Sequence, residues 1–518
     1  MASKSRPGSP ELELDAGDLP GAAPGALTGL VVSGVRWKLL SRLVSEATRA
    51  VVVVVLARLV TPEEYGLAGM AFVVTSFGLM LTDPALGAAL IQRPAIDERD
   101  RSTVFWAAAG IGVVLTVVGV ALSPLVADFF GEPQVRELFA VSSLCFFVIS
   151  LSVVHRALLI RRLEYRSLEI REMVAIASGG VVAVLVAAAG YGPWAIVLNF
   201  VVSSLVSTAL VWWFLDWRPQ AMFSRESARN LSGFSGRIFM STLLTWGDQN
   251  VDKALIGRFL GAVSLGAYSL AQAAMLLPMS MLGRPFNQVL SPAFSRIQED
   301  ADRLERAWLK SKRLSAAIVL PATLGLIVVA PDFVPVLFGD QWDEAVLPLQ
   351  LLLVGALATA LTNLQWSVLQ ARGEASTLLR LTLGSSIVKW AAIVVGLQWG
   401  IIGVATALAG ARWALVVPSM WISTRAVSFG FWPALRSGSE MLPAALATAG
   451  IGVGVRYLLL ETSTPQAARL ALVAAAMLVA YAAILLATAP HVVRELRAAV
   501  RKPTRNGQDH RPEGPPKD

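Results

Sequence analysis

The chain has 518 residues, of which 55% are hydrophobic and 15% are charged, and its mean hydropathy is +0.61. This is more apolar sequence than a soluble core needs, so the composition predicts a polytopic membrane protein. The net charge of +8 comes from basic residues spread over short loops between apolar runs, which argues against a nucleic-acid partner. The single cysteine, Cys145, lies in an apolar run, which excludes an intrachain disulfide and a cysteine-rich metal site.

The first 28 residues are rich in Pro, Gly, Ala and acidic side chains and have no apolar core followed by a cleavage pattern. This composition predicts a disordered tail over residues 1–28 instead of a signal peptide. About 20 apolar residues cross a bilayer as one helix, and that length predicts an all-α integral membrane protein with about 14 transmembrane helices. The expected spans are 34–59, 64–90, 103–124, 135–155, 172–190, 193–215, 236–258, 264–294, 314–331, 345–369, 377–396, 400–422, 441–460 and 468–489.

A polar interruption followed by a turn occurs in two apolar stretches. Residues 246–271 place charged side chains in the middle of an otherwise apolar segment, which then turns at Gly261. A similar turn occurs 200 residues earlier, and the matching positions are Arg58 and Arg258, Gly66 and Gly266, and Ala71 and Ala271. Further on, a charged residue precedes a proline in both copies, at Asp83-Pro84 and at Arg284-Pro285. The nearly constant offset favours a duplicated half.

The distribution of Lys and Arg over the loops predicts the orientation. One set of loops holds almost all of them, within 93–101, 156–171, 218–229, 296–313, 372 and 425–436. The other set has only Arg258 and Arg469 and carries acidic stretches. Both termini are therefore expected in the cytoplasm, and the basic tail over residues 491–518 is expected to be solvated and to contact anionic lipid.

The loops and motifs also limit the class of function. The longest outer loop, at about residues 331–344, is too small for a catalytic domain. No P-loop is present, and no GxGxxG motif follows a strand, so no nucleotide site is expected. The sequence thus predicts neither an enzyme, nor a cofactor, nor a bound metal.

Two blocks resemble a known family. They are LARLVTPEEYGLAGMAFVVTSF with DPALGAALIQR, and DKALIGRFLGAVSLGAYSLAQAAMLLP with NQVLSPAFSRIQED. Both are similar to the polysaccharide-transporter and oligosaccharide-flippase branch of the multidrug/oligosaccharidyl-lipid/polysaccharide (MOP) exporter superfamily. The resemblance implies two pseudo-symmetric six-helix lobes around a central cavity, followed by two C-terminal helices. The corresponding domains are an N-terminal lobe over 29–230, a C-terminal lobe over 231–422 and the last two helices within 423–490.

Several charges fall near the expected bilayer midplane, where each costs roughly 2.5–3.5 kcal/mol on insertion scales unless it is solvated or paired. They are Glu46, Arg49, Asp248, Asp252, Lys253, Lys389 and Arg412. These side chains must line water or pair with one another. Glu46 could pair with Arg42 or Arg49 on its own helix, and Asp252 with a neighbouring helix, so structural pairing stays open beside a functional role.

The basic members of this set are candidates for substrate binding. Arg49, Lys389 and Arg412 have no acid at a suitable spacing on their own helices, so a pyrophosphate from the substrate could supply the anion. Arg42 and Arg284, nearer the cytoplasmic mouth, are expected to help load it. Asp248, Asp252 and Glu46 are candidates for ion coupling, because no nucleotide site is visible.

The resemblance implies a flippase or exporter that moves an undecaprenyl-pyrophosphate-linked oligosaccharide, or a related polysaccharide precursor, across the bacterial cytoplasmic membrane. Alternating access by rocking of the two lobes is the expected mode for such a repeat. A glycan polymerase and glycosyltransferases of the same pathway are possible partners. Two alternatives remain open at this point, a cation-coupled multidrug exporter of the same superfamily and a membrane glycan polymerase or ligase.

Overall fold

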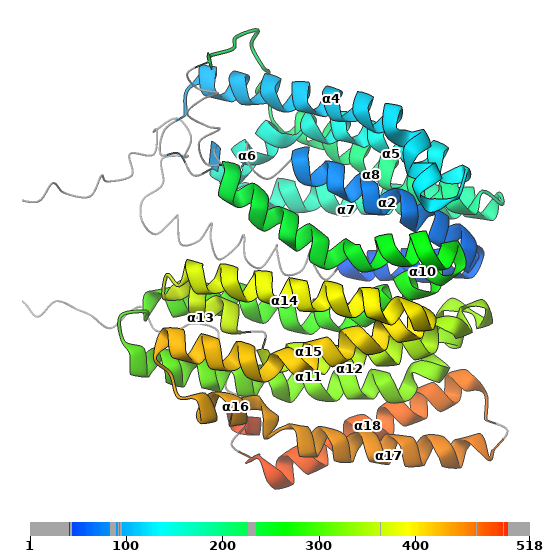
Figure 1. The fold of residues 1–518 in the computed structure, drawn as a ribbon, viewed down its shortest axis with the longest axis vertical. Helices are drawn as coiled ribbons and strands as arrows, with labels where there is room; N and C mark the ends of the chain where they lie inside the picture. The colour runs from blue at the N-terminus through cyan, green and yellow to red at the C-terminus, as the bar shows by residue number, and fades with distance from the viewer. Residues whose placement is uncertain are drawn as a thin grey trace, which may run out of the picture. The chain divides into compact units, whose positions relative to one another are not determined.

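The computed structural model describes residue 41 and residues 44–495, apart from gaps at 83–86, 88–89, 92, 94–95, 226–234, 363, 463 and 491. Within 235–241 and 277–293 it describes the backbone alone. Across the described residues all regular structure is helical, which confirms the predicted all-α class (Figure 1).

The first half of the chain contains a helix over residues 44–59, which the sequence placed in the first span. It is followed by α2 (Pro62–Thr82), α4 (Glu98–Phe130), α5 (Gln134–Ser150), α6 (Val153–Arg161), α7 (Tyr165–Ala188) and α8 (Gly192–Phe214). The second half contains α10 (Ser235–Arg296), α11 (Ala301–Phe338), η1 (Asp340–Ala345), α12 (Val346–Thr362), α13 (Gln365–Ala371), α14 (Ala375–Gly396), η2 (Leu397–Trp399), α15 (Gly400–Val427), α16 (Phe431–Ser439), α17 (Leu442–Leu460) and α18 (Gln466–Thr488).

Ten helical stretches of the described residues are long and apolar enough to cross a membrane, or eleven if the bent pair α5 and α6 forms one span. Several of the ten stretches are not one continuous helix. Gly261 interrupts α10 with φ 82°, and η2 separates α14 from α15. The multi-pass membrane architecture is thus present, while the number of fourteen spans stays a prediction.

Local sequence explains how the turn after the first helix is built. Thr61 and Glu64 form a capping box, in which the Thr61 amide donates to Glu64 Oε2 at 2.8 Å and the Glu64 amide donates to Thr61 Oγ1 at 3.3 Å. Pro62 occupies the first helical position of α2, where the missing amide proton costs nothing. The sequence TPEE therefore fixes the start of α2.

The chain divides into two compact units, and each is composed of separate segments. The first unit holds residues 1–277, 337–348 and 382–408, and the second holds 278–336, 349–381 and 409–518. The lobe boundaries expected from the sequence stay a prediction.

In the first unit, α4 packs on α5, α7 packs on α8, and α5 also contacts α2 and α8. The two similar turns meet in this unit through a reciprocal contact. A Cβ atom added to Gly66 would overlap the carbonyl oxygen of Ala262, and one added to Gly266 would overlap the carbonyl oxygen of Pro62. Such a pair of equivalent contacts is what a two-fold relation between duplicated segments produces, so it supports the duplication.

In the second unit, buried side chains of α11, α12, α17 and α18 form one core, which includes Leu320, Leu361, Ala445 and Leu485. A buried carboxylate ties α17 and α18 to α11. Asp332 of α11 accepts from Arg456 Nε at 2.6 Å and from Arg469 Nε at 2.8 Å, and only 1% of its side chain is exposed. Both apolar packing and ion pairs to Asp332 therefore hold α17 and α18 against α11.

Candidate functional site

The first unit contains a cavity of about 690 Å³. Its wall is formed by the helix over 44–59 together with α2, α5, α6, α7 and α8. Its polar lining side chains are Arg49, Thr82, Ser152, Arg156, Arg171, Glu172, Asn199, Ser203, Ser204, Ser207 and Thr208. The remaining lining residues are apolar, which makes the cavity a mixed pocket of the kind that holds an amphipathic ligand.

The charge of this cavity is positive. Arg49 Nη2 lies 2.6 Å from Glu172 Oε1, and Arg171 Nη2 lies 4.0 Å from the other oxygen of the same carboxylate. Arg156 of α6 is the third cation of the wall. The lining thus contains three arginines and one glutamate, and this positive balance favours an anionic ligand. The side chains of Arg49 and Glu172 are 51% and 43% exposed, so their ion pair opens onto the cavity instead of being sealed in the core.

Hydroxyl groups cover another part of the wall. Ser203 Oγ donates to the carbonyl of Ala175 at 3.0 Å, and Thr208 Oγ1 donates to the carbonyl of Val148 at 3.1 Å. Both bonds cross from α8 to a neighbouring helix, and each leaves the hydroxyl oxygen available as an acceptor. A ligand with hydroxyl groups of its own, such as a sugar, finds acceptors here.

The sequence identified only one of the three arginines in this cavity as a binding residue, namely Arg49. Arg156 and Arg171 entered the prediction only as loop charges that set the orientation. Their positions just inside α6 and α7 were the missed signal, because a cation beyond the first turn of an apolar helix faces protein or a cavity. Glu46 lies half-buried on the same helix as Arg49, and the described residues give its carboxylate no hydrogen-bonding partner.

Lys389 does not line this cavity. Its Nζ forms an ion pair with Asp248 Oδ2, which joins α14 to the first arm of α10. The acid that the helix of Lys389 lacks thus comes from α10, which is the structural pairing that the sequence left open, and a role of Lys389 in substrate binding stays a prediction. Each partner of this pair is 21% exposed, and the second oxygen of Asp248 is buried without a hydrogen bond from any described residue.

Asp252, one turn after Asp248, holds the two arms of α10 together. Its carboxylate accepts from Tyr268 Oη at 2.8 Å and from Gln272 Nε2 at 3.2 Å, and both donors lie beyond the break at Gly261. Asp252 is 4% exposed. A carboxylate that accepts from two side chains across a chain reversal braces the two arms against each other. Both donors lie on the same long helix as Asp252, beyond the turn.

The remaining predicted site residues lie elsewhere. Arg412 of α15 belongs to the second unit, where it is half-buried against Gly355 of α12 and has no ion pair among the described residues. Arg42 and the side chain of Arg284 lie outside the described part of the chain. Within that described part, no group of three His, Cys, Asp or Glu residues could hold a metal ion.

A helical, multi-pass membrane fold with a polar cavity inside a helical unit defines a transporter-like membrane protein. The family model for polysaccharide biosynthesis proteins matches residues 55–347. The lipopolysaccharide biosynthesis protein WzxC of Escherichia coli (strain K12) is 30% identical over 378 residues, which are 72% of this chain and 76% of that protein. The chain therefore belongs to the polysaccharide biosynthesis protein family, as its two turn blocks indicated.

A second relative and a solved structure extend the likeness over nearly the whole chain. The succinoglycan biosynthesis transport protein ExoT of Rhizobium meliloti (strain 1021) is 28% identical over 482 residues, covering 91% of this chain and 96% of that protein. The lipid II flippase MurJ, in an inward closed conformation, superimposes with a TM-score of 0.68 at 14% identity and covers 91% of this chain and all of that one. The second likeness shows a shared fold.

Proposed function

We propose that this protein is a flippase that moves an undecaprenyl-pyrophosphate-linked oligosaccharide, or a related polysaccharide precursor, across the bacterial cytoplasmic membrane. The cavity of the first unit carries the proposal, because it combines three arginines with acceptor hydroxyls and apolar walls. Arginine binds phosphate oxygens through its planar set of donors, and hydroxyl oxygens suit sugars. The two curated relatives, whose names include lipopolysaccharide biosynthesis and succinoglycan transport, support the same substrate class.

Movement of the substrate needs two accessible states of the protein. We propose alternating access between an N-terminal lobe over 29–230 and a C-terminal lobe over 231–422, with the helices of 423–490 appended, a disordered tail at 1–28 and a basic tail at 491–518. Both termini face the cytoplasm in this proposal, because the Lys- and Arg-rich loops do. A glycan polymerase and glycosyltransferases of the same pathway are the proposed partners.

The energy source is proposed to be an ion gradient. Of the three predicted acids, Asp248 and Glu46 are suited to the task, since each keeps a carboxylate oxygen without a hydrogen bond among the described residues. Asp252 is assigned to the scaffold, because its Oδ2 accepts from Tyr268 and Gln272 and its Oδ1 accepts from the Lys253 amide. If Asp248→Asn and Glu46→Gln both leave transport unchanged, or if transport persists after the gradient is collapsed, passive flipping replaces this proposal.

The direct test reconstitutes the full chain in liposomes with a fluorescent undecaprenyl-pyrophosphate trisaccharide, whose exposure is followed with a membrane-impermeant quencher. Faster quenching of the inner-leaflet pool than in protein-free liposomes is expected, and Arg156→Gln should slow it. Arg136→Gln, which changes an exposed arginine outside the cavity, serves as the matched control. Quenching at the protein-free rate would contradict the function, and efflux of a cationic dye instead would favour the multidrug alternative.

A further inference from the structure

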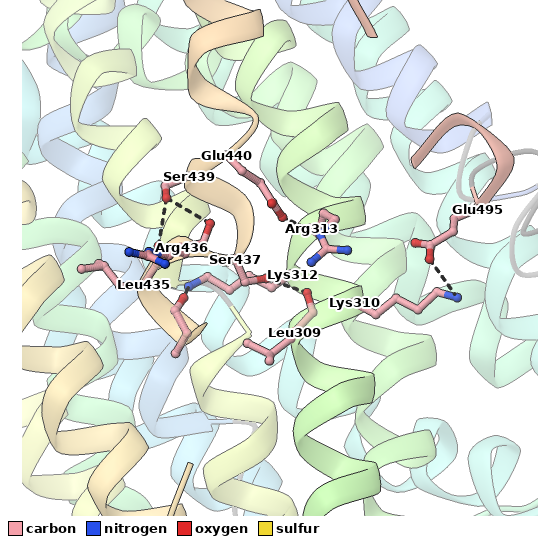
Figure 2. A network of polar contacts seen from close by, with 11 residues as sticks. Leu309, Lys310, Lys312, Arg313, Leu435, Arg436, Ser437, Ser439, Glu440 and Glu495 are labelled. Carbon is pink, nitrogen blue, oxygen red and sulfur yellow. Dashed lines mark hydrogen bonds and ion pairs between the residues drawn. The ribbon is translucent and has the colours of Figure 1, made fainter. Parts of the chain in front are cut away.

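The start of α11 in the second unit is a polar hub that fixes α16. Lys312 is 3% exposed and donates from Nζ to the carbonyl oxygen of Ala434, while Ser437 Oγ donates to the carbonyl of Leu309 at 2.7 Å. Arg313 pairs with Glu440 at the end of α16 (Figure 2). One face of this short helix is therefore anchored on α11, and the opposite face is directed away from it.

The face directed away from α11 is built differently. Trp432 is 65% exposed, and Arg436 is exposed as well. The end of α15, just before α16, adds a similar pair: Trp421 is 50% exposed, and the guanidinium of Arg425 lies 4.9 Å from the centroid of its indole ring. Two arginines and two tryptophans thus lie exposed around one helix junction.

The cations of α11 and the exposed arginines of α15 and α16 differ in whether they have a partner within the protein. Lys310, Lys312 and Arg313 of α11 each bind an acceptor of the protein, with Lys310 Nζ 3.5 Å from Glu495 Oε1 (Figure 2). Arg425 and Arg436 have no carboxylate and no side-chain hydrogen bond among the described residues. A guanidinium that lies against the face of an indole ring can still donate hydrogen bonds from its own N–H groups to an anion.

We infer that the exposed face of α16 and the end of α15, defined by Trp421, Arg425, Trp432 and Arg436, is a binding surface for the headgroup of an anionic phospholipid. Exposed tryptophans at the end of a membrane-spanning helix are typical of the headgroup level of the bilayer. Arginine at that level is attracted to anionic lipid phosphates, and the apolar sides of the indoles suit the adjoining acyl region. The contacts with α11 hold α16 in place, so little conformational entropy is lost when the headgroup binds.

Native mass spectrometry of the full-length protein, titrated with phosphatidylglycerol or phosphatidylcholine, tests the inference. Phosphatidylglycerol should bind more tightly than phosphatidylcholine, and Arg425→Gln and Arg436→Gln should each weaken it about fivefold, the effect of one cation near an anionic surface. Arg436→Lys should keep most of the affinity. The matched control Arg136→Gln, at an exposed arginine of α5 in the first unit, should leave it unchanged.

Three outcomes would overturn the inference. Equal affinity for the two phospholipids would show that no anion is recognised. Unchanged phosphatidylglycerol affinity in the Arg425→Gln/Arg436→Gln double variant, with an unfolding temperature like that of the wild type, would place the lipid site elsewhere. Loss of undecaprenyl-pyrophosphate binding in that variant, with phosphatidylglycerol binding intact, would assign the surface to the transported lipid.

Discussion

The two halves of the chain join equivalent helices with ion pairs of opposite polarity. In the first half, Arg49 of the first helix pairs with Glu172 of α7, the fifth expected span. In the second half, the first arm of α10 supplies the acid, Asp248, and α14, the eleventh expected span, supplies the base, Lys389. Within a repeat of six helices these are the same two positions, with the signs exchanged.

Either polarity thus allows an ion pair between these two helices, so the sign of the charge alone does not define the role of the pair. The surroundings of the two pairs separate their roles. Arg49 and Glu172 open onto the cavity of the first unit and are about half exposed, while Asp248 and Lys389 are each 21% exposed. The first pair is therefore available to a ligand, and the second resembles a partly buried structural pair.

The turns themselves are more alike than the charges. Gly66 and Gly266 contact the opposite turn through equivalent backbone atoms, but Arg58 and Arg258 use different partners. Arg58 Nε donates to the carbonyl of Leu337 at 2.9 Å, and the Arg258 guanidinium lies 5.7 Å from the ring of Phe129. Each arginine thus contacts the end of another long helix, α11 in one case and α4 in the other.

The largest effect is expected where the halves are most alike. Gly66→Ala and Gly266→Ala each place a methyl group on a carbonyl oxygen that no rotamer change can move, so each should destabilise the protein by about 3 kcal/mol or more. Thermal unfolding in detergent measures the effect. Gly69→Ala, one turn further along α2, meets only ordinary contacts at 3.4 Å and should change little. A large loss in only one of the two variants would break the reciprocal relation.

The second effect concerns the more enclosed ion pair. Lys389→Gln leaves the Asp248 carboxylate partly buried without its cation, and we expect a loss of stability of about 2–3 kcal/mol with reduced membrane abundance. The double variant Asp248→Asn/Lys389→Gln removes both charges and should recover most of it. Wild-type stability of Lys389→Gln, accompanied by weaker binding of a lipid-linked pyrophosphate, would return Lys389 to the substrate site.

The sequence predicted the all-α membrane class, because apolar runs are a local pattern, whereas the number of fourteen spans stays a prediction. The predicted turn at Gly261 is also local, because a glycine acts on the backbone at its own position. The pairing of the charges depends on which helices become neighbours. Glu172 lies 123 residues from Arg49, and Asp248 lies 141 residues from Lys389, so no spacing within one helix could reveal these partners.

The same limit explains the candidate site. The sequence indicates Arg49, because an arginine at the midplane of an apolar helix is costly. The span lengths place Arg156 and Arg171 in loops, because a length rule cannot show that α7 begins at Tyr165 and includes Arg171. Both arginines lie within helices, α6 and α7, and not in the loops between them.

The exposed ion pair should affect transport more than stability. Arg49→Gln removes a pair that solvent already screens, so we expect a stability loss of about 1 kcal/mol or less. If a charge-assisted bond to the substrate is lost, binding of the lipid-linked pyrophosphate falls by about tenfold or more. Flipping rate and unfolding temperature are measured on the same preparation. A fall in stability with unchanged flipping per molecule would make Arg49 part of the scaffold.

The smallest effect is expected at the two exposed arginines beside the turns. Phe129→Leu keeps the apolar contact but removes the ring under Arg258, which should cost about 0.5–1 kcal/mol, the range of an exposed cation–π contact. Arg258→Lys keeps a cation above the ring and should cost less. Arg58→Lys loses the guanidinium Nε donor that reaches Leu337, and a flexible ammonium cannot reproduce its planar geometry, so this variant should be affected more than Arg258→Lys. Equal unfolding temperatures for the two lysine variants would contradict this prediction. Both arginines would then act only by extending their charge to the membrane surface, and their different partners would contribute equally to stability.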